Sequence, residues 1–140
     1  MGYFRVGGIE LRHRLFVYGT LLQGERRHNM MARARLIGET RTAARFTLHD
    51  LGRCPAMTAG GATAVCGLLY EADGPTMIAI DAYECHPRFF RRQTIELEDG
   101  SMAVAYLVAP GRVRGFPAIA AGDWRLRFRP RPRIRATILV

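Results

Sequence analysis

The chain contains no lysine, so all 21 of its basic residues are arginine. Against 12 acidic residues this gives a formal net charge of +9, which raises the question of a nucleic-acid partner. So complete a replacement of lysine is typical of a coding preference rather than of a binding patch. The arginines are dispersed, except for an alternating cluster near the C-terminus: Arg125, Arg127, Arg129, Arg131, Arg133 and Arg135.

Alternate residues share one face of an extended segment. Single-strand binders add a platform of aromatic side chains on which bases stack, and no such platform accompanies this cluster. We therefore expect no nucleic-acid partner, and we interpret the cluster as a solvated edge or as a contact within a homo-oligomer.

Cysteine is also scarce, with only Cys54, Cys66 and Cys85. The number is odd, no Cys-x-x-Cys pair is present, and no histidine lies at ligand spacing. We therefore expect neither a disulfide framework nor a structural zinc site. Free cysteine is usually a small core residue, so we expect inert buried thiols. Cys85 is the one of chemical interest, because it adjoins Glu84.

The chain lacks a hydrophobic run long enough to cross a bilayer, and its first ten residues lack the apolar stretch of a signal peptide. We therefore expect a cytoplasmic protein with no membrane partner. Its 140 residues, 49% hydrophobic and 24% charged, are sufficient for one domain with a proper core. We predict a lead-in over 1–14 and a single domain over 15–140, which includes the arginine-rich tail 125–140.

Hydrophobic periodicity and turn residues predict roughly six strands and two helices. Strands are expected at 15–18, at two places within 34–50 around Gly38, at 63–71, 89–98 and 102–108, with strand-like character again over 133–140. Helices are expected at 26–34 and at 73–85, the second opened by Asp73 and Pro75. Turns are expected at 51–55, 58–61 and Asp99-Gly100. The candidate core positions between 34 and 50 are Leu36, Ile37, Phe46 and Leu48. This pattern is typical of an α+β domain with a curved, mixed or mostly antiparallel sheet.

Two features bear on chemistry. The apolar run from Leu15 leads into Tyr18-Gly19-Thr20-Leu21, where glycine lets backbone N–H groups turn outward to bind an anion. Downstream, Glu84 ends the second helix and supplies a single carboxylate. Together they are sufficient for a small acyl-transfer site, although a glutamate at a helix end is by default a solvated residue.

Four sequence elements, in order, resemble the γ-glutamylcyclotransferase-like family, particularly its small bacterial and plant-type members. They are Val17-Tyr18-Gly19-Thr20-Leu21; Leu36-Ile37-Gly38-Glu39 with Phe46-Thr47-Leu48 and 51–55; 65–70 with Ile80-Asp81-Ala82-Tyr83-Glu84 and 89–97; and 105–108 with Gly122-Asp123-Trp124-Arg125. The resemblance covers about positions 15 to 125.

The resemblance implies a small mixed or antiparallel β-barrel flanked by helices, with its cavity beside the Tyr18–Leu21 loop. It also implies a small-molecule substrate and a reaction without metal or organic cofactor: the α-amine of a γ-glutamyl amine or peptide attacks its own side-chain carbonyl, which gives 5-oxoproline and a free amine. Glu84 matches the catalytic glutamate, Tyr18, Gly19, Thr20 and Leu21 match the loop that binds substrate, and Tyr106 matches a tyrosine that faces the cavity.

Two departures from the family pattern lie close to Glu84. Cys85 replaces the usual glycine, so a positive φ at that position would strain the backbone or move the carboxylate. Phe90 replaces a tyrosine and lacks its hydroxyl. A second hypothesis therefore stays open, in which the protein binds a small anion or a protein partner without catalysis. Tyr18 and Tyr106 can also be core aromatics, and we expect Trp124 to be a packing anchor for the tail rather than a ligand platform.

Overall fold

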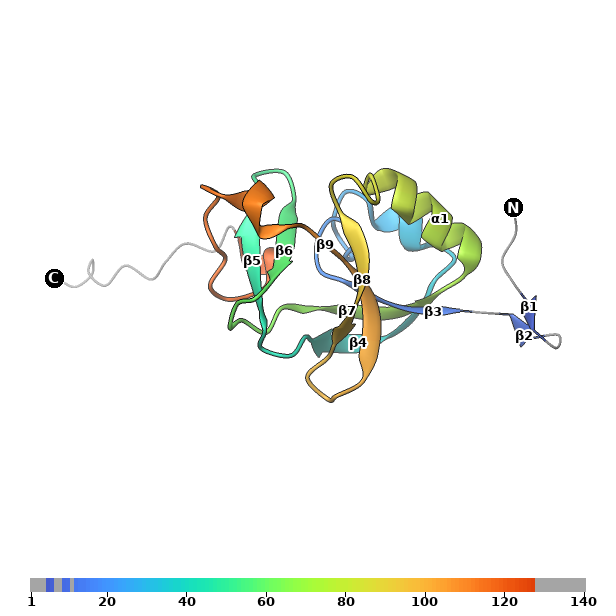
Figure 1. The fold of residues 1–140 in the computed structure, drawn as a ribbon. Helices are drawn as coiled ribbons and strands as arrows, with labels where there is room; N and C mark the ends of the chain where they lie inside the picture. The colour runs from blue at the N-terminus through green and yellow to red at the C-terminus, as the bar shows by residue number, and fades with distance from the viewer. Residues whose placement is uncertain (1–4, 7–8, 11, 128–140) are drawn as a thin grey trace, which may run out of the picture.

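The computed structural model of the chain describes residues 5–6, 9–10 and 12–127 (Figure 1). The strands are β1 (Arg5–Val6), β2 (Ile9–Glu10), β3 (His13–Val17), β4 (Arg35–Arg41), β5 (Phe46–Asp50), β6 (Pro55–Ala59), β7 (Cys66–Ala72), β8 (Arg91–Glu96) and β9 (Met102–Leu107). The helices are α1 (Gly74–Tyr83) and three short 3-10 helices, η1 (His28–Met31), η2 (Pro110–Val113) and η3 (Trp124–Leu126). The predicted strand at 133–140 and four arginines of the C-terminal cluster lie outside the described residues.

The main sheet has the order β4-β7-β3-β9-β6-β5, and β8 pairs with β9 as a branch. β9 runs parallel to β3 and β6, whereas the other pairings of this sheet are antiparallel. The expected α+β class with a mixed sheet is confirmed. The expected barrel is not closed, because β4 and β5 are the two ends of the strand order in the described part of the chain.

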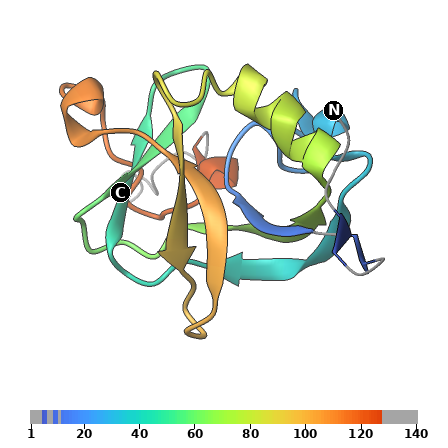
Figure 2. The same cartoon turned by 45° about the vertical axis from the view of Figure 1, so that its right-hand side comes forward.

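Strand β3 is apolar throughout its second half because it faces two cores. Leu15 and Val17 belong to a core that includes Met77 of α1, while Phe16 belongs to a second core that includes Leu48 of β5. Alternate side chains of a strand point to opposite faces, so a strand covered on both faces is apolar at every position. In Figures 1 and 2, α1 and the β5–β6 pair lie to either side of β8 and β9.

The capping residues seen in the sequence explain where α1 lies. Asp73 is the N-cap, and its Oδ1 accepts a hydrogen bond from the backbone N–H of Thr76 at 2.9 Å. Pro75 occupies the first turn, where its missing N–H costs nothing. Met77 and Ile80 face the core, whereas Ile78 is exposed. The predicted helix at 73–85 is thus confirmed over Gly74–Tyr83, and the one predicted at 26–34 is only the short η1.

Several predictions between residues 34 and 61 are wrong. Leu36 and Ile37 are exposed rather than core residues, because one edge strand, β4, runs through Gly38 with a shift of register there. Phe46 and Leu48 are buried as predicted. β6 was not expected, because the glycine and proline signals at 51–55 and 58–61 hide the short apolar strand between them. None of the helices in the described part of the chain has the length and apolar character to span a membrane.

Candidate active site

A cavity of about 180 Å³ opens where the end of β3, the end of α1, β9 and the start of β6 meet. It is lined by Phe16, Val17, Tyr18, Gly19, Thr20, Leu21, Arg26, Cys54, Pro55, Tyr83, Glu84, Phe90 and Tyr106. All six residues predicted for the site are among them. Of the lining residues only Arg26 and Glu84 carry charged side chains, so the site pairs a mainly apolar wall with one carboxylate and one guanidinium.

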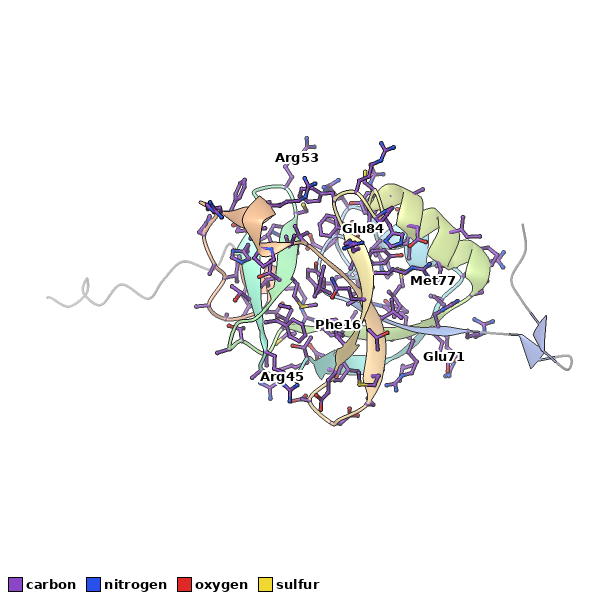
Figure 3. The ribbon with its side chains drawn as sticks, in the orientation of Figure 1. Phe16, Arg45, Arg53, Glu71, Met77 and Glu84 are labelled. Carbon is purple, nitrogen blue, oxygen red and sulfur yellow. The ribbon has the colours of Figure 1, made fainter. Side chains whose placement is uncertain are left out.

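Glu84 is the C-cap of α1, where its backbone N–H donates to the carbonyl of Ile80 at 2.8 Å. Its side chain is half-buried and turns into the molecule, whereas Arg53 projects outward (Figure 3). None of the described residues donates a hydrogen bond to the Glu84 carboxylate. Burial in this apolar surrounding raises the pKa of Glu84 from 4.5 to about 7, because the charged form loses its hydration. The carboxylate can therefore exchange protons near neutral pH.

The loop after β3 is closed by its own backbone. The N–H of Leu22 donates to the carbonyl of Gly19 at 3.0 Å, and the N–H of Arg27 donates to the carbonyl of Thr20 at 2.9 Å. The backbone N–H groups of Gly19, Thr20 and Leu21 donate to no group in the described part of the chain. Three N–H groups are thus free to bind an anion beside the cavity.

Gly19 is needed for close approach rather than for a positive φ. A Cβ atom at this position would lie 2.7 Å from Cγ and 2.9 Å from Cδ of Pro55. Pro55 begins β6, so the loop after β3 and the turn before β6 meet in direct contact at the cavity. Any side chain at residue 19 would push the two walls of the site apart.

Two of the three tyrosines that line the cavity, Tyr18 and Tyr106, differ in what their hydroxyls can do. The Tyr18 hydroxyl donates to the carbonyl of Tyr106 at 2.6 Å and accepts from the N–H of Met57 at 3.1 Å. Tyr18 thus lines the cavity, while its oxygen connects the end of β3 to β9 and to the middle of β6. The Tyr106 hydroxyl instead donates to Oδ1 of Asp81 on α1. Burial raises the pKa of both tyrosines, so both stay protonated at neutral pH.

Glu25 anchors the loop after β3 to the far end of the described chain. Its Oε1 accepts from Nε1 of Trp124 at 3.1 Å and from Nη2 of Arg127 at 2.9 Å. Trp124 is buried, and the Arg127 guanidinium lies 3.9 Å from its ring centroid. Trp124 is thus a buried packing residue that holds the loop of the site, while the tail that we expected it to anchor lies mostly outside the described residues.

Sequence reasoning missed several residues of the cavity, among them Tyr83, whose hydroxyl lies 2.8 Å from Oγ1 of Thr20, and the loop residues Arg26 and Cys54. Arg26 donates from Nη2 to the carbonyl of Arg53 at 3.2 Å, which joins the loop after β3 to the turn before β6. Cys54 follows in that turn, and burial raises the pKa of its thiol, with the Glu84 charge adding to the effect. A hydrophobic and turn pattern carries no signal for either residue, because their position depends on the contact between two loops distant in sequence.

Cys85 was expected to be a buried thiol and is exposed. Its φ is 56°, the left-handed region that favours glycine, so the strain expected on the replacement of glycine is present. Phe90 is buried in the cavity wall, where a tyrosine would add a hydroxyl.

A second hollow lies between the β5–β6 pair and the β8–β9 pair. Its charged lining residues, Arg45 and Glu96, form an ion pair of 3.5 Å with each other. The first cavity, with its unpaired carboxylate, is therefore the candidate active site.

Comparison with known proteins places the chain in a family. A sequence model of the family described as "Gamma-glutamyl cyclotransferase, AIG2-like" matches residues 15–126. A relative from Vibrio cholerae serotype O1 is 33% identical over 114 residues, which are 81% of this chain and 96% of the relative. The gamma-glutamylcyclotransferase family protein YtfP of Escherichia coli K12 is 32% identical over 111 residues, or 79% of this chain and 95% of YtfP. The crystal structure of a uropathogenic E. coli-specific protein superposes with a TM-score of 0.73 at 26% identity, over 82% of this chain and 94% of that one. The chain therefore belongs to the gamma-glutamyl cyclotransferase, AIG2-like family.

Proposed function

We propose that this protein is a cyclotransferase that converts a γ-glutamyl amine or peptide into 5-oxoproline and a free amine, with Glu84 as its acid and base. The observation that carries the proposal is the Glu84 carboxylate, which lies in a mainly apolar cavity, accepts no hydrogen bond from the described residues and has its pKa raised by burial to about 7. A group with a pKa near the working pH both accepts and returns protons efficiently. The three free N–H groups of residues 19–21 border the same cavity.

In this reaction the nucleophile and the electrophile belong to one molecule. Glu84 takes a proton from the substrate α-ammonium, and the amine nitrogen then bonds to the γ-carbonyl carbon to close a five-membered ring. We assign to the N–H groups of Gly19, Thr20 and Leu21 the binding of the resulting oxyanion or of the α-carboxylate. Glu84 returns this proton to the leaving nitrogen as the carbon–nitrogen bond breaks. The ring nitrogen still carries a second proton, which Glu84 takes and passes to the released amine, so the products are the neutral amide of 5-oxoproline and an ammonium. Folding the substrate into this conformation can supply about 7–11 kcal/mol of the barrier in favourable cases.

The first test is to incubate the purified protein with γ-glutamylalanine, glutathione and γ-glutamylethylamide, and to detect 5-oxoproline by mass spectrometry. We expect product from at least one compound, and a loss of at least 100-fold in kcat for Glu84→Gln, roughly the contribution of general acid–base catalysis. Glu71→Gln is a matched control, because Glu71 lies on β7 in an exposed ion pair with Arg35.

The dependence of kcat/KM on pH distinguishes catalysis by Glu84 from a structural role. The base acts only when ionised, so kcat/KM should rise with pH around a midpoint near the Glu84 pKa of about 7. If Glu84→Gln retains both the rate and this profile, the assignment is wrong. If the protein binds these compounds and forms no product from any of them, the result would support the alternative of a small-anion binder without catalysis. The observation in favour of that alternative is the strained backbone at Cys85, next to Glu84.

A further inference from the structure

The Tyr106 hydroxyl forms part of a small polar network behind the cavity. Tyr106 on β9 and Arg92 on β8 are directly paired across the two strands. Asp81 on α1 connects them, since its Oδ1 accepts from the Tyr106 hydroxyl and its Oδ2 lies 3.1 Å from Nη2 of Arg92. Tyr106 lines the cavity and Asp81 does not.

This network determines which way the Tyr106 proton points. A tyrosine hydroxyl has one proton to donate and lone pairs that accept, while an ionised carboxylate can only accept. The proton of Tyr106 is therefore committed to Asp81. Burial raises the pKa of Tyr106, and the hydrogen bond to Asp81 and its charge raise it further, so the hydroxyl keeps that proton. Any further hydrogen bond that the Tyr106 hydroxyl forms with a ligand can therefore use only its lone pairs.

An acceptor at this position requires a donor on the ligand. The substrate of the proposed reaction carries one strong donor group, its α-ammonium, which must also reach Glu84. The backbone N–H groups of Gly19–Leu21 and the Arg26 guanidinium, which border the same cavity, can only donate. The hydroxyls of Thr20 and Tyr83, also in the lining, are hydrogen-bonded to each other at 2.8 Å. The cavity thus has an acceptor pair, Tyr106 and Glu84, for an ammonium, and a donor set for a carboxylate.

We infer that Asp81 is a positioning residue that turns Tyr106 into a hydrogen-bond acceptor for the α-ammonium of the substrate, so that the pair selects γ-glutamyl compounds with a free α-amine. The inference rests on the proposed function and deepens it. Asp81 acts through Tyr106 and does not touch the substrate. Arg92 keeps the second oxygen of Asp81 occupied, which leaves Oδ1 for Tyr106.

Asp81→Asn tests the direction of this hydrogen bond. The Arg92 guanidinium donates, so it holds the carbonyl oxygen of the new amide and directs the NH₂ group to Tyr106. Tyr106 then accepts from residue 81 and releases its own proton toward the cavity, where it opposes an ammonium. Tyr106→Phe removes the acceptor oxygen altogether and provides a second variant.

The readout is binding to protein that also carries Glu84→Gln, measured by calorimetry with two ligands. γ-Glutamylalanine carries the α-amine, and glutarylalanine lacks only that group. We expect Asp81→Asn and Tyr106→Phe each to weaken γ-glutamylalanine about tenfold, which is about 1.4 kcal/mol, and to leave glutarylalanine unchanged. The double variant should lose no more than either single one, because both remove one interaction. Asp99→Asn, in the turn between β8 and β9, is the matched control.

Equal weakening of both ligands by Asp81→Asn would show a structural role and overturn the inference, while the proposed function would stand. Unchanged binding of γ-glutamylalanine to folded Asp81→Asn protein would overturn it as well. If the Glu84→Gln protein binds neither ligand and the wild-type protein forms no 5-oxoproline, the proposed function fails and the inference fails with it.

Discussion

At the scale of single residues, the site shows what sequence reasoning can and cannot find. Glu84 and the Tyr18–Leu21 loop carry a recognisable motif, so their place at the cavity was predicted. Arg26 and Cys54 were not, because the contact of two loops brings them there. The hydroxyl of Tyr18 also has a different task from that of Tyr106, and only their hydrogen-bond partners reveal it.

Cys85 offers a test of residue-scale strain. Its φ of 56° costs an ordinary side chain about 1–2 kcal/mol, and glycine avoids that cost but is more flexible in the unfolded chain. We expect Cys85→Gly to raise the free energy of unfolding by about 0.5–1 kcal/mol, measured by urea denaturation. Cys85→Ala removes the thiol and keeps the Cβ, so it should give no gain. A gain of equal size for alanine would place the effect in the thiol rather than in the backbone.

At the scale of elements, prediction succeeded where the stop and start signals are local. Asp73 and Pro75 mark the beginning of α1, and the Asp99-Gly100 turn lies between β8 and β9. Prediction failed where strand pairing determines whether a segment forms a strand and which of its side chains are buried. β6 lies between two stretches rich in glycine and proline and becomes a strand by pairing with β5 and β9. Leu36 and Ile37 are apolar, yet they belong to an edge strand and remain exposed.

Asp73 carries a prediction at this scale because it has two roles. Its Oδ1 caps α1, while Oδ2 forms an ion pair with Arg33 at 2.6 Å. Burial opposes ionisation, but the hydrogen bonds from Thr76 and Arg33 outweigh it and hold the pKa of Asp73 at about 2. Asp73→Ala removes both roles, and we expect it to lower the free energy of unfolding by about 2 kcal/mol.

Asp73→Asn separates the two roles, since asparagine caps a helix about as well as aspartate does. We expect it to cost about half as much as the alanine variant, roughly 1 kcal/mol in urea denaturation at pH 7. Because the folded pKa lies below the ordinary 3.8, the wild-type advantage should be complete above pH 4 and vanish as the pH falls toward 2. Equal losses for both variants would mean that the cap contributes nothing.

At the scale of the whole molecule, the apolar β3 connects two cores, one with α1 and one with the β5–β6 pair. The sequence predicted a mixed sheet in an α+β domain, and it placed β3 inside it. The branch of β8 on β9 and the open strand order could not be predicted, because residues far apart in the chain determine which edges meet. The candidate site lies where β3, α1, β9 and β6 meet, so the ionisation of a site residue changes the free energy of unfolding of the whole domain.

Glu84 makes that effect measurable through pH. Its folded pKa of about 7 exceeds the ordinary value of 4.5, so between these two values the unfolded chain has released a proton that the folded protein keeps. The free energy of unfolding should therefore be highest below pH 4.5 for this group and fall as the pH rises to 7, by up to roughly 3 kcal/mol. Glu84→Gln holds no titrating group and should escape this loss, so the variant should be more stable than wild type at pH 8 and similar to it at pH 4.5. Urea denaturation at both pH values, with Glu71→Gln as the matched control, measures the difference.

A stability difference between wild type and Glu84→Gln that does not change with pH would mean that the Glu84 carboxylate is hydrated in the folded protein. The same result would remove the physical basis for its action as a base near neutral pH.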